Sequence, residues 1–328
     1  MTVPRSQSAP SGRALSPGLL MRATRAPFLT ATLAPVLLGI AVAGRSGFFD
    51  PLTALITVAA ACLVQLGLNV NNDIFDTLQG ADDANPTPTP FSGGSRVLQE
   101  GLLGLRGMAV LSGGAYALAG ALGLLLLALR PSTELVVIAA VGAFISLAYT
   151  MPPFKLAYRG LGELATAIGF GPVMLLGAYV VQSGGPLSWE ALVASIPVAL
   201  LVAMILYVNE IPDRTGDAIA GKRTLPVRWP RRLVLWGWDA SVAGAFLTVI
   251  VGVAVGLLPV PTLLALLAVP LALQVRRGLA SHYDEPYALV PTLAANIKLH
   301  LTVGLLLVAG YLAAAFAQGP LGIRPFLW

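Results

Sequence analysis

Side chains that could bind a metal ion are concentrated in residues 69–83, which read NVNNDIFDTLQGADD. They follow residues 52–68, an apolar run in which Gln65 is the one strongly polar side chain. On a helix, residues three and four positions apart share a face, and Asn72 and Asp76 stack one turn apart. The same spacing places four side chains on one face: Gln65, Asn69, Asp73 and Asp76. Ionisable groups inside a bilayer cost on the order of 2.5–3.5 kcal/mol each, so this polar stripe indicates a functional site.

The aspartates of this segment repel one another unless a cation lies among them. Asp82 and Asp83 add two more carboxylates just beyond the apolar run. Carboxylate and amide oxygens are the ligands that Mg²⁺ prefers, and Mg²⁺ commonly holds phosphorylated substrates. The segment therefore predicts a Mg²⁺ site that binds a phosphorylated molecule.

A second acidic cluster lies in residues 209–224, NEIPDRTGDAIAGKRT. Asp213 and Asp217 are one helical turn apart if the helix continues past Pro212, which repeats the spacing of Asn72 and Asp76. We interpret the two clusters as opposite walls of one site. The alternative is a solvated helix end that carries incidental acids.

Basic residues follow both clusters, and a diphosphate needs such counter-charge. Gly93 and Gly94 would let backbone N–H groups approach phosphate oxygens. Tyr149 is either an interfacial anchor or a substrate contact. The cations that we expect to contact substrate are Arg96, Lys155, Lys222 and Arg223. The remaining basic loop residues are better explained as topology signals: Arg228, Arg231, Arg232, Arg276 and Arg277.

The composition identifies the protein class. Of 328 residues, 56% are hydrophobic and 11% are charged, against roughly 25% charged in a soluble domain. The formal net charge is +5. However, the basic residues lie between apolar runs and do not form a patch interspersed with aromatic residues, which argues against a nucleic-acid partner. The single cysteine, Cys62, excludes an intrachain disulfide. We expect an integral membrane protein.

Apolar runs long enough to cross a bilayer recur along the chain. We expect an all-α bundle of nine transmembrane helices in one domain, residues 21–319, between a disordered tail (1–20) and a short external tail (320–328). The eighth run is the weakest because three prolines shorten or kink it. The nine runs are 27–44, 52–72, 106–129, 132–150, 160–182, 188–210, 232–256, 260–275 and 293–317.

The distribution of positive charge predicts the orientation. With a cytoplasmic N-terminus, every Lys and Arg except Arg45, Arg130 and Arg324 falls on the cytoplasmic side, as the positive-inside rule requires. The long polar connections lie on that side too: 73–105, 151–159, 211–231 and 276–292. We therefore expect a multi-pass protein of the cytoplasmic membrane whose site faces the cytoplasm.

The two clusters resemble the paired aspartate-rich motifs of the UbiA superfamily of intramembrane prenyltransferases. The first reads Asn72-Asp73-x-x-Asp76-x-x-x-Gly80-x-Asp82, and the second reads Asp213-x-x-x-Asp217-x-x-x-Gly221-Lys222-x-Thr224. Four further segments are similar to those of this superfamily: Arg25-Ala-Pro27, Phe49-Asp50-Pro51-Leu52, Gly160-Leu161-Gly162-Glu163 and Phe170-Gly171. The resemblance covers residues 22–317 and is greatest to the 1,4-dihydroxy-2-naphthoate polyprenyltransferases of menaquinone biosynthesis.

This resemblance implies nine helices around a lipid-accessible cavity and Mg²⁺-dependent transfer of a polyprenyl group from its diphosphate to an aromatic acceptor. For the naphthoate branch, the acceptor also loses its carboxylate. By position, the metal ligands would be Asn72, Asp76, Asp82, Asp213 and Asp217. The catalytic acids would be Asp73, Asp76, Asp213 and Asp217. The substrate-binding residues would be Arg25, Asn69, Arg96, Tyr149, Lys155, Lys222 and Arg223.

Two alternatives remain from the sequence. An ion-coupled transporter also carries acids within a bundle, but it would place them near the bilayer midplane. A related enzyme would use another acceptor: 4-hydroxybenzoate, homogentisate, a related naphthoate, a porphyrin-type alcohol or a glycerolipid. The long segment 85–96, NPTPTPFSGGSR, together with Glu210 and Pro212, departs from the naphthoate enzymes and leaves the acceptor open. The sequence does not indicate the oligomeric state.

Overall fold

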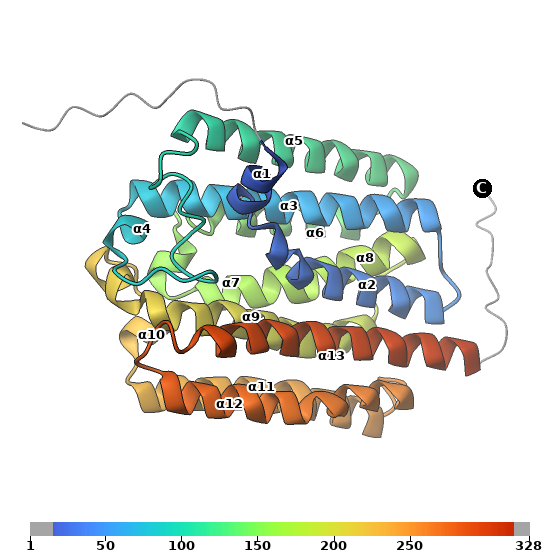
Figure 1. Cartoon of the computed structure of the whole chain (residues 1–328). Helices are drawn as coiled ribbons and strands as arrows, with labels where there is room; N and C mark the ends of the chain where they lie inside the picture. The colour runs from blue at the N-terminus through green and yellow to red at the C-terminus, as the bar shows by residue number, and fades with distance from the viewer. Residues whose placement is uncertain (1–15, 318–328) are drawn as a thin grey trace, which may run out of the picture.

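The computed structural model describes residues 16–317, and within that range the chain is a bundle of helices (Figure 1). Helices occupy all nine predicted positions, which confirms the all-α prediction. Eight of them are long and apolar enough to cross a membrane, whereas α6 is apolar but has only 16 residues. The elements are α1 (Pro17–Ala23), η1 (Ala26–Leu29), α2 (Thr30–Arg45), α3 (Pro51–Leu78), α4 (Ala81–Ala84), α5 (Leu105–Leu129), α6 (Thr133–Ala148), η2 (Leu156–Arg159), α7 (Gly162–Ile168), η3 (Gly169–Val173), α8 (Met174–Ser183), α9 (Trp189–Ile219), α10 (Leu225–Arg228), α11 (Arg231–Ala254), η4 (Val260–Ala268), α12 (Val269–His282) and α13 (Val290–Ala317).

Polar side chains fix where three of the spanning helices begin. Asp50 caps α3 by accepting hydrogen bonds from the N–H groups of Leu52 and Thr53, at 2.9 and 3.4 Å. Ser132 and Ser188 cap α6 and α9 in the same way. Such caps satisfy N–H groups that have no partner within the helix. All the expected spans begin within a few residues of their predicted starts.

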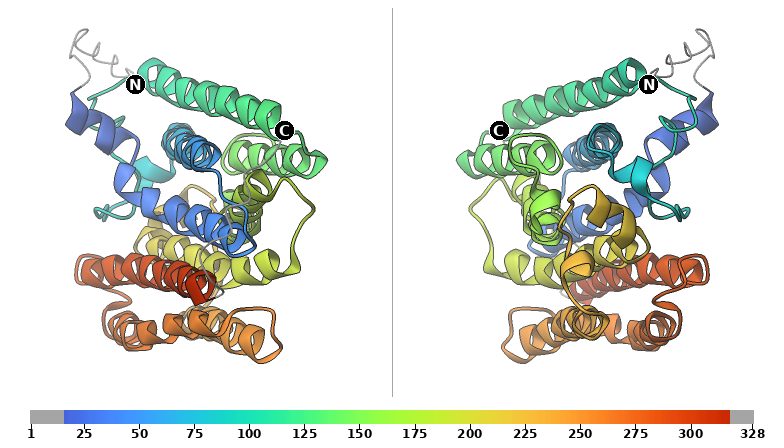
Figure 2. Two further views of the ribbon diagram at one scale, coloured as in Figure 1. Left: turned by 90° about the vertical axis from the view of Figure 1, so that its right-hand side faces the viewer. Right: turned by 90° about the vertical axis from the view of Figure 1, so that its left-hand side faces the viewer.

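Helix α9 forms the centre of the bundle. It packs against α2, α7, α11 and α13, and most of its side chains from Ala191 to Asp217 are buried. In Figure 2 helix α5 lies at one outer edge of the bundle, with α11 and α12 at the opposite edge. Helix α9 continues through Pro212 to Ile219, as the spacing of Asp213 and Asp217 requires.

Several predicted boundaries differ from the structure. The eighth span opens as the 3-10 helix η4 and becomes α-helical only at Val269, because the prolines at 259 and 261 remove backbone donors at its start. Helix α1 begins at Pro17, capped by Ser16, and so takes in the last residues of the expected N-terminal tail. Residues 1–15 of that tail, and all of the expected external C-terminal tail, lie outside the described residues.

Candidate active site

The two acidic clusters meet at one polar pocket of about 70 Å³. The last turns of α3 supply Asn72 and Asp76, and α4 supplies Asp82. The last turns of α9 supply Asp213 and Asp217 on the other side. The pocket is built where two long apolar helices run on into polar sequence.

Lys222 lies between the two acidic helices. Its Nζ is 3.0 Å from Oδ2 of Asp76 and 3.7 Å from Oδ1 of Asp217. Asn72 donates a hydrogen bond to the same Asp76 oxygen at 3.1 Å, and the hydroxyl of Tyr158 donates to Oδ1 of Asp76 at 2.8 Å. Burial alone would lower the pKa of Lys222, but the carboxylates of Asp76 and Asp217 outweigh it and hold that pKa well above its usual value. Lys222 is therefore a fixed positive charge inside the pocket.

The segment 85–96 covers the pocket and donates hydrogen bonds to both walls. The N–H of Gly93 and Nδ2 of Asn85 donate to the two carboxylate oxygens of Asp213, at 2.9 and 2.7 Å. The N–H of Ser95 donates to Oδ2 of Asp73 at 3.0 Å. We call this segment the covering loop. It holds the carboxylates of α3 and α9 through backbone N–H groups and the side-chain amide of Asn85 rather than through charged side chains.

Glycine is required where the covering loop approaches Asp82. Gly93 and Gly94 have φ values of 74° and 72°, in the left-handed region. A Cβ on Gly94 would collide with the carboxylate of Asp82. Burial, with the nearby carboxylates of Asp76 and Asp73, raises the pKa of Asp82 to about 8 despite the opposing charges of Lys222 and Arg25.

Several residues proposed from the sequence do not line the polar pocket. Asp73 is 3% exposed, bonds Ser95 and lies 3.9 Å from the guanidinium of Arg25. Arg96 donates to the backbone oxygen of Asp82 at 2.5 Å. Lys155 stacks over the ring of Tyr158 with its Nζ 5.8 Å from the ring centroid. Asn69 lines the neighbouring apolar cavity, and Arg223 lies outside the residues that line either space.

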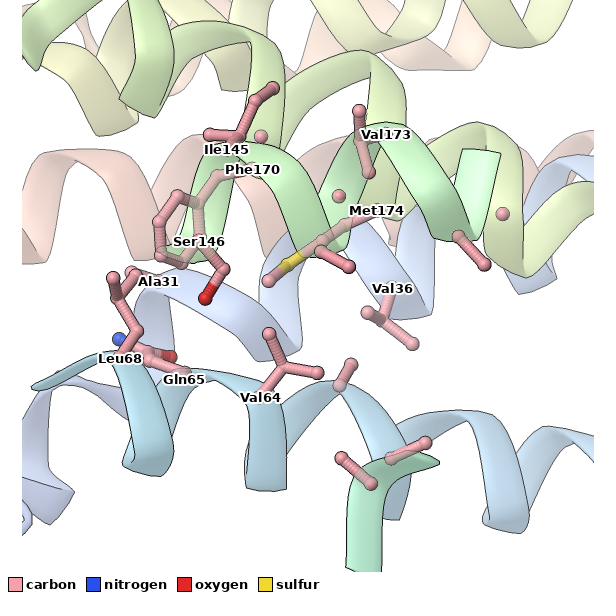
Figure 3. A pocket seen from close by; sticks show the side chains of 18 of the residues that line it. Ala31, Val36, Val64, Gln65, Leu68, Ile145, Ser146, Phe170, Val173 and Met174 are labelled. Carbon is pink, nitrogen blue, oxygen red and sulfur yellow. The ribbon is translucent and has the colours of Figure 1, made fainter. Parts of the chain in front are cut away.

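A large apolar cavity of about 720 Å³ adjoins the polar pocket. Figure 3 shows Val64, Gln65 and Leu68 of α3 on one side of it. Across from them lie Ile145, Ser146, Phe170, Val173 and Met174 (Figure 3). The two spaces share five lining residues: Arg25, Asn72, Tyr149, Leu206 and Asn209. A molecule with a charged head and a long apolar tail fits this pair of spaces.

The donor set of the polar pocket suits a hard divalent cation. Oδ2 of Asp82, Oδ2 of Asp217 and Oδ1 of Asn209 are buried and have no hydrogen-bond partner. No three His, Cys, Asp or Glu side chains within residues 16–317 are grouped to hold one ion in this conformation. The reason lies in the contacts above: Lys222 separates Asp76 from Asp217, and the covering loop occupies Asp213. The residues fit Mg²⁺ chemically, but their carboxylates would have to turn toward it.

Sequence reasoning missed several contributors to the pocket. Tyr158 bonds Asp76 from the connection after α6, and no periodicity there marks it. Asn85 and Ser92 belong to the covering loop, where only the glycines stand out. Asn85 could be identified from the sequence because it closely follows the first acidic motif.

Comparisons with known proteins agree with this architecture. Residues 32–297 match the UbiA prenyltransferase family. The chain is 31% identical to the 2-carboxy-1,4-naphthoquinone phytyltransferase of Synechocystis, covering 93% of this chain and 97% of that one. It is 27% identical to the 1,4-dihydroxy-2-naphthoate octaprenyltransferase of Bacillus subtilis, covering 94% and 97%.

A solved structure shares the fold. The UbiA homolog from Archaeoglobus fulgidus bound to GPP and Mg²⁺ superposes with a TM-score of 0.60 at 14% identity, covering 88% of this chain and 99% of that one. The described helices are therefore those of a multi-pass integral membrane protein. With the family match over most of its length, the chain belongs to the UbiA prenyltransferase family.

Proposed function

We propose that this protein transfers a polyprenyl group from a polyprenyl diphosphate to 1,4-dihydroxy-2-naphthoate in a Mg²⁺-dependent reaction at the cytoplasmic face of the membrane. One observation carries the proposal: a small pocket of acids and cations opens directly into a large apolar cavity. The polar pocket would hold the diphosphate, and the apolar cavity would hold the isoprenoid and the aromatic ring. The names of the Synechocystis and Bacillus relatives support a naphthoate acceptor.

The metal would be held by the oxygens of Asn72, Asp76, Asp82, Asp213 and Asp217, with Asp73 supporting the covering loop. When bound, Mg²⁺ neutralises charge on the diphosphate as the bond to the allylic carbon breaks. The Mg²⁺ and GPP bound to the Archaeoglobus homolog support this role.

The chain's own cations add to this charge stabilisation. Lys222 and Arg25 line the polar pocket and would bind diphosphate oxygens. Arg96 would act through its bond to the backbone oxygen of Asp82, and Lys155 would act through its contact with the ring of Tyr158. Because the departing diphosphate takes both electrons of the broken bond, these positive charges favour the charge-separated state.

The apolar cavity protects the allylic cation until the acceptor attacks it. Its walls are apolar side chains and a few polar groups, among them Asn69, Tyr116 and Tyr149. Few water molecules would be held there, so the electron-rich ring competes well for the cation. The proton or carboxylate of the attacked ring carbon then leaves and restores aromaticity.

The test is an acceptor panel. Purified protein with Mg²⁺ and one polyprenyl diphosphate is incubated with 1,4-dihydroxy-2-naphthoate, 4-hydroxybenzoate, homogentisate or a glycerol phosphate. We expect prenylation of the naphthoate and little of the others. A preference for another acceptor would replace the naphthoate assignment, and no transfer to any acceptor would refute the function.

A further inference from the structure

The segment Phe49-Asp50-Pro51-Leu52 lies at the end of the bundle opposite the polar pocket. Figure 1 shows the start of α3 at one end of the bundle and α4 at the other. At about 1.5 Å of rise per residue, Asp50 is roughly 33 Å from Asn72 along α3. Asp50 lines neither the polar pocket nor the apolar cavity. Its role therefore has to be sought in its own contacts at the far end of the bundle.

Asp50 joins three segments of the chain that are distant in sequence. Its Oδ1 caps α3, and its Oδ2 lies 2.7 Å from Nη2 of Arg130 in the connection between α5 and α6. Its N–H donates a hydrogen bond to Oε1 of Gln182 in α8 at 2.7 Å. Nε2 of Gln182 in turn donates to Oγ1 of Thr53 at 3.0 Å. We call Asp50, Thr53, Arg130 and Gln182 the far-end network.

The far-end network is largely protected from solvent. Thr53 and Gln182 are 2% and 1% exposed, and the side chain of Arg130 is 12% exposed. Both the oxygen and the nitrogen of the Gln182 amide have a partner, and Arg130 and Asp50 neutralise each other. Buried polar groups are tolerated when they are bonded to one another in this way. The network therefore occupies the end of the bundle without needing water as a partner for the Gln182 amide.

The far-end network lies directly beyond the apolar cavity. The hydroxyl of Thr57 donates to the backbone oxygen of Thr53 at 2.7 Å, and the N–H of Arg130 donates to the backbone oxygen of Leu126 at 2.8 Å. Val181 immediately precedes the glutamine of the network. Val181, Leu126 and Thr57 all line the cavity, and they are 1%, 5% and 8% exposed. The cavity wall is thus buried where it meets the network.

We propose that the far-end network closes the apolar cavity against water from the side of the membrane opposite the covering loop. The positive-inside rule assigns this side to the exterior. The consequence for the reaction rests on the proposed function. Water that entered the cavity would compete with the acceptor: its oxygen would bond to the allylic carbon and lose a proton, giving a prenol beside the released diphosphate. Asp50 and Arg130 therefore act by excluding water, without touching substrate.

A second ion pair at the same end of the bundle provides a matched control. Arg45 of α2 lies 2.8 Å from Glu190 of α9. The cavity-lining residues of these two helices nearest to the pair are Val36 and Val202, each more than two helical turns away. Loss of the Arg45 pair removes the same charge from the same face of the protein, but it should not uncover the cavity.

Thiol labelling tests the closure directly. Val181→Cys is introduced into protein in which Cys62 is replaced by alanine, and a membrane-impermeant thiol reagent is added from the side opposite the covering loop. We expect slow labelling of this parent protein. Arg130→Met or Asp50→Asn should speed labelling on the order of tenfold, because the end of the cavity then opens more readily. Asn caps a helix as well as Asp does, so Asp50→Asn removes the ion pair and keeps the cap. Arg45→Met should label as slowly as the parent.

The product ratio tests the consequence for the reaction. Purified variants without the added cysteine are assayed with Mg²⁺, geranylgeranyl diphosphate and 1,4-dihydroxy-2-naphthoate, and both prenol and prenylated naphthoate are measured. Arg130→Met and Asp50→Asn should raise the ratio of prenol to prenylated naphthoate several-fold. The KM for the donor should not change, because the polar pocket is distant and intact. Arg45→Met should keep the wild-type ratio.

The two measurements separate the closure from the proposed function. The closure would be overturned if the parent protein were labelled as fast as its Arg130→Met variant, or if Arg45→Met accelerated labelling as much as Arg130→Met and Asp50→Asn. Faster labelling with an unchanged product ratio would overturn the role of the network in the reaction. A wild type that transfers no prenyl group would overturn the proposed function, whereas labelling would still decide whether the network closes the cavity.

Discussion

The ammonium of Lys222 lies 3.0 Å from Oδ2 of Asp76 and 3.7 Å from Oδ1 of Asp217, so one cation joins the acidic ends of α3 and α9. The side chains of Lys222 and Asp76 are 12% and 6% exposed, and solvent screens the pair weakly. Lys222 therefore neutralises in the free protein the carboxylates that we assign to Mg²⁺. Metal binding would release its ammonium for the diphosphate.

Lys222→Met should destabilise the metal-free protein strongly. It leaves two buried carboxylates facing each other, and removing one partner of a buried pair costs on the order of 3–5 kcal/mol. Thermal unfolding in EDTA should show this loss, and Mg²⁺ with pyrophosphate should restore much of it. Lys222→Arg, which keeps the charge, is the matched control. If Lys222→Met lost as much stability in Mg²⁺ with pyrophosphate as in EDTA, Mg²⁺ would not take the place of the Lys222 ammonium.

The two acidic walls should act as one unit. Asp76→Asn and Asp213→Asn should each abolish transfer, and the double variant should be scarcely worse than either. Wild-type protein should gain about 2.7 kcal/mol at a hundredfold excess of Mg²⁺ and prenyl diphosphate over Kd. The melting temperature of each variant should not respond to these ligands. A wild-type shift with Na⁺ alone, and none with diphosphate, would instead favour a transporter.

The covering loop should tolerate no side chain at Gly94. Gly94→Ala adds a Cβ against the carboxylate of Asp82 at a φ of 72°. Gly101 has a φ of 65° but open space around it, so Gly101→Ala carries only the backbone strain, roughly 1–2 kcal/mol. We expect Gly101→Ala to lower the melting temperature and keep its activity, and Gly94→Ala to lose activity as well. Activity assays normalised to folded protein distinguish the two, and equal activities would argue against the covering loop's role.

Much of this site follows from sequence because its two walls are the ends of apolar helices. The spacing of Asn72 and Asp76, repeated at Asp213 and Asp217, predicts which side chains share a face, and α9 does continue past Pro212. The roles of the cations are less predictable. Arg96 and Lys155 stand in the right segments, but their side chains reach a backbone oxygen and a tyrosine ring. Tyr158 is undetectable because its contact with Asp76 depends on how η2 packs against the distant helix α3.

Arg25 and Arg96 should therefore differ in their effect on the donor. Arg25 lines both the polar pocket and the apolar cavity, whereas Arg96 bonds the backbone oxygen of Asp82. Arg25→Ala should raise the KM for the prenyl diphosphate on the order of tenfold, with a smaller rise for Arg96→Ala. The KM for the aromatic acceptor should change little in either variant. If Arg25→Ala raised the KM for the acceptor more than the KM for the donor, Arg25 would not bind the diphosphate.

The orientation of the bundle can be tested with introduced cysteines, once the half-buried Cys62 has been replaced by alanine. Pro86 of the covering loop and Ser281 at the end of α12 are exposed in segments that the positive-inside rule assigns to the cytoplasm, and Gly185 lies in a connection assigned to the opposite side. In inside-out vesicles a membrane-impermeant thiol reagent should label cysteines at 86 and 281, and in right-side-out vesicles it should label the one at 185.

Pro86 belongs to the covering loop, so its labelling also reports the side from which the diphosphate arrives. Added Mg²⁺ and prenyl diphosphate should slow labelling at 86 but not at 281, because only the former lies beside the polar pocket. Labelling of position 86 from the outer side would reverse the orientation and move the proposed site to the other face.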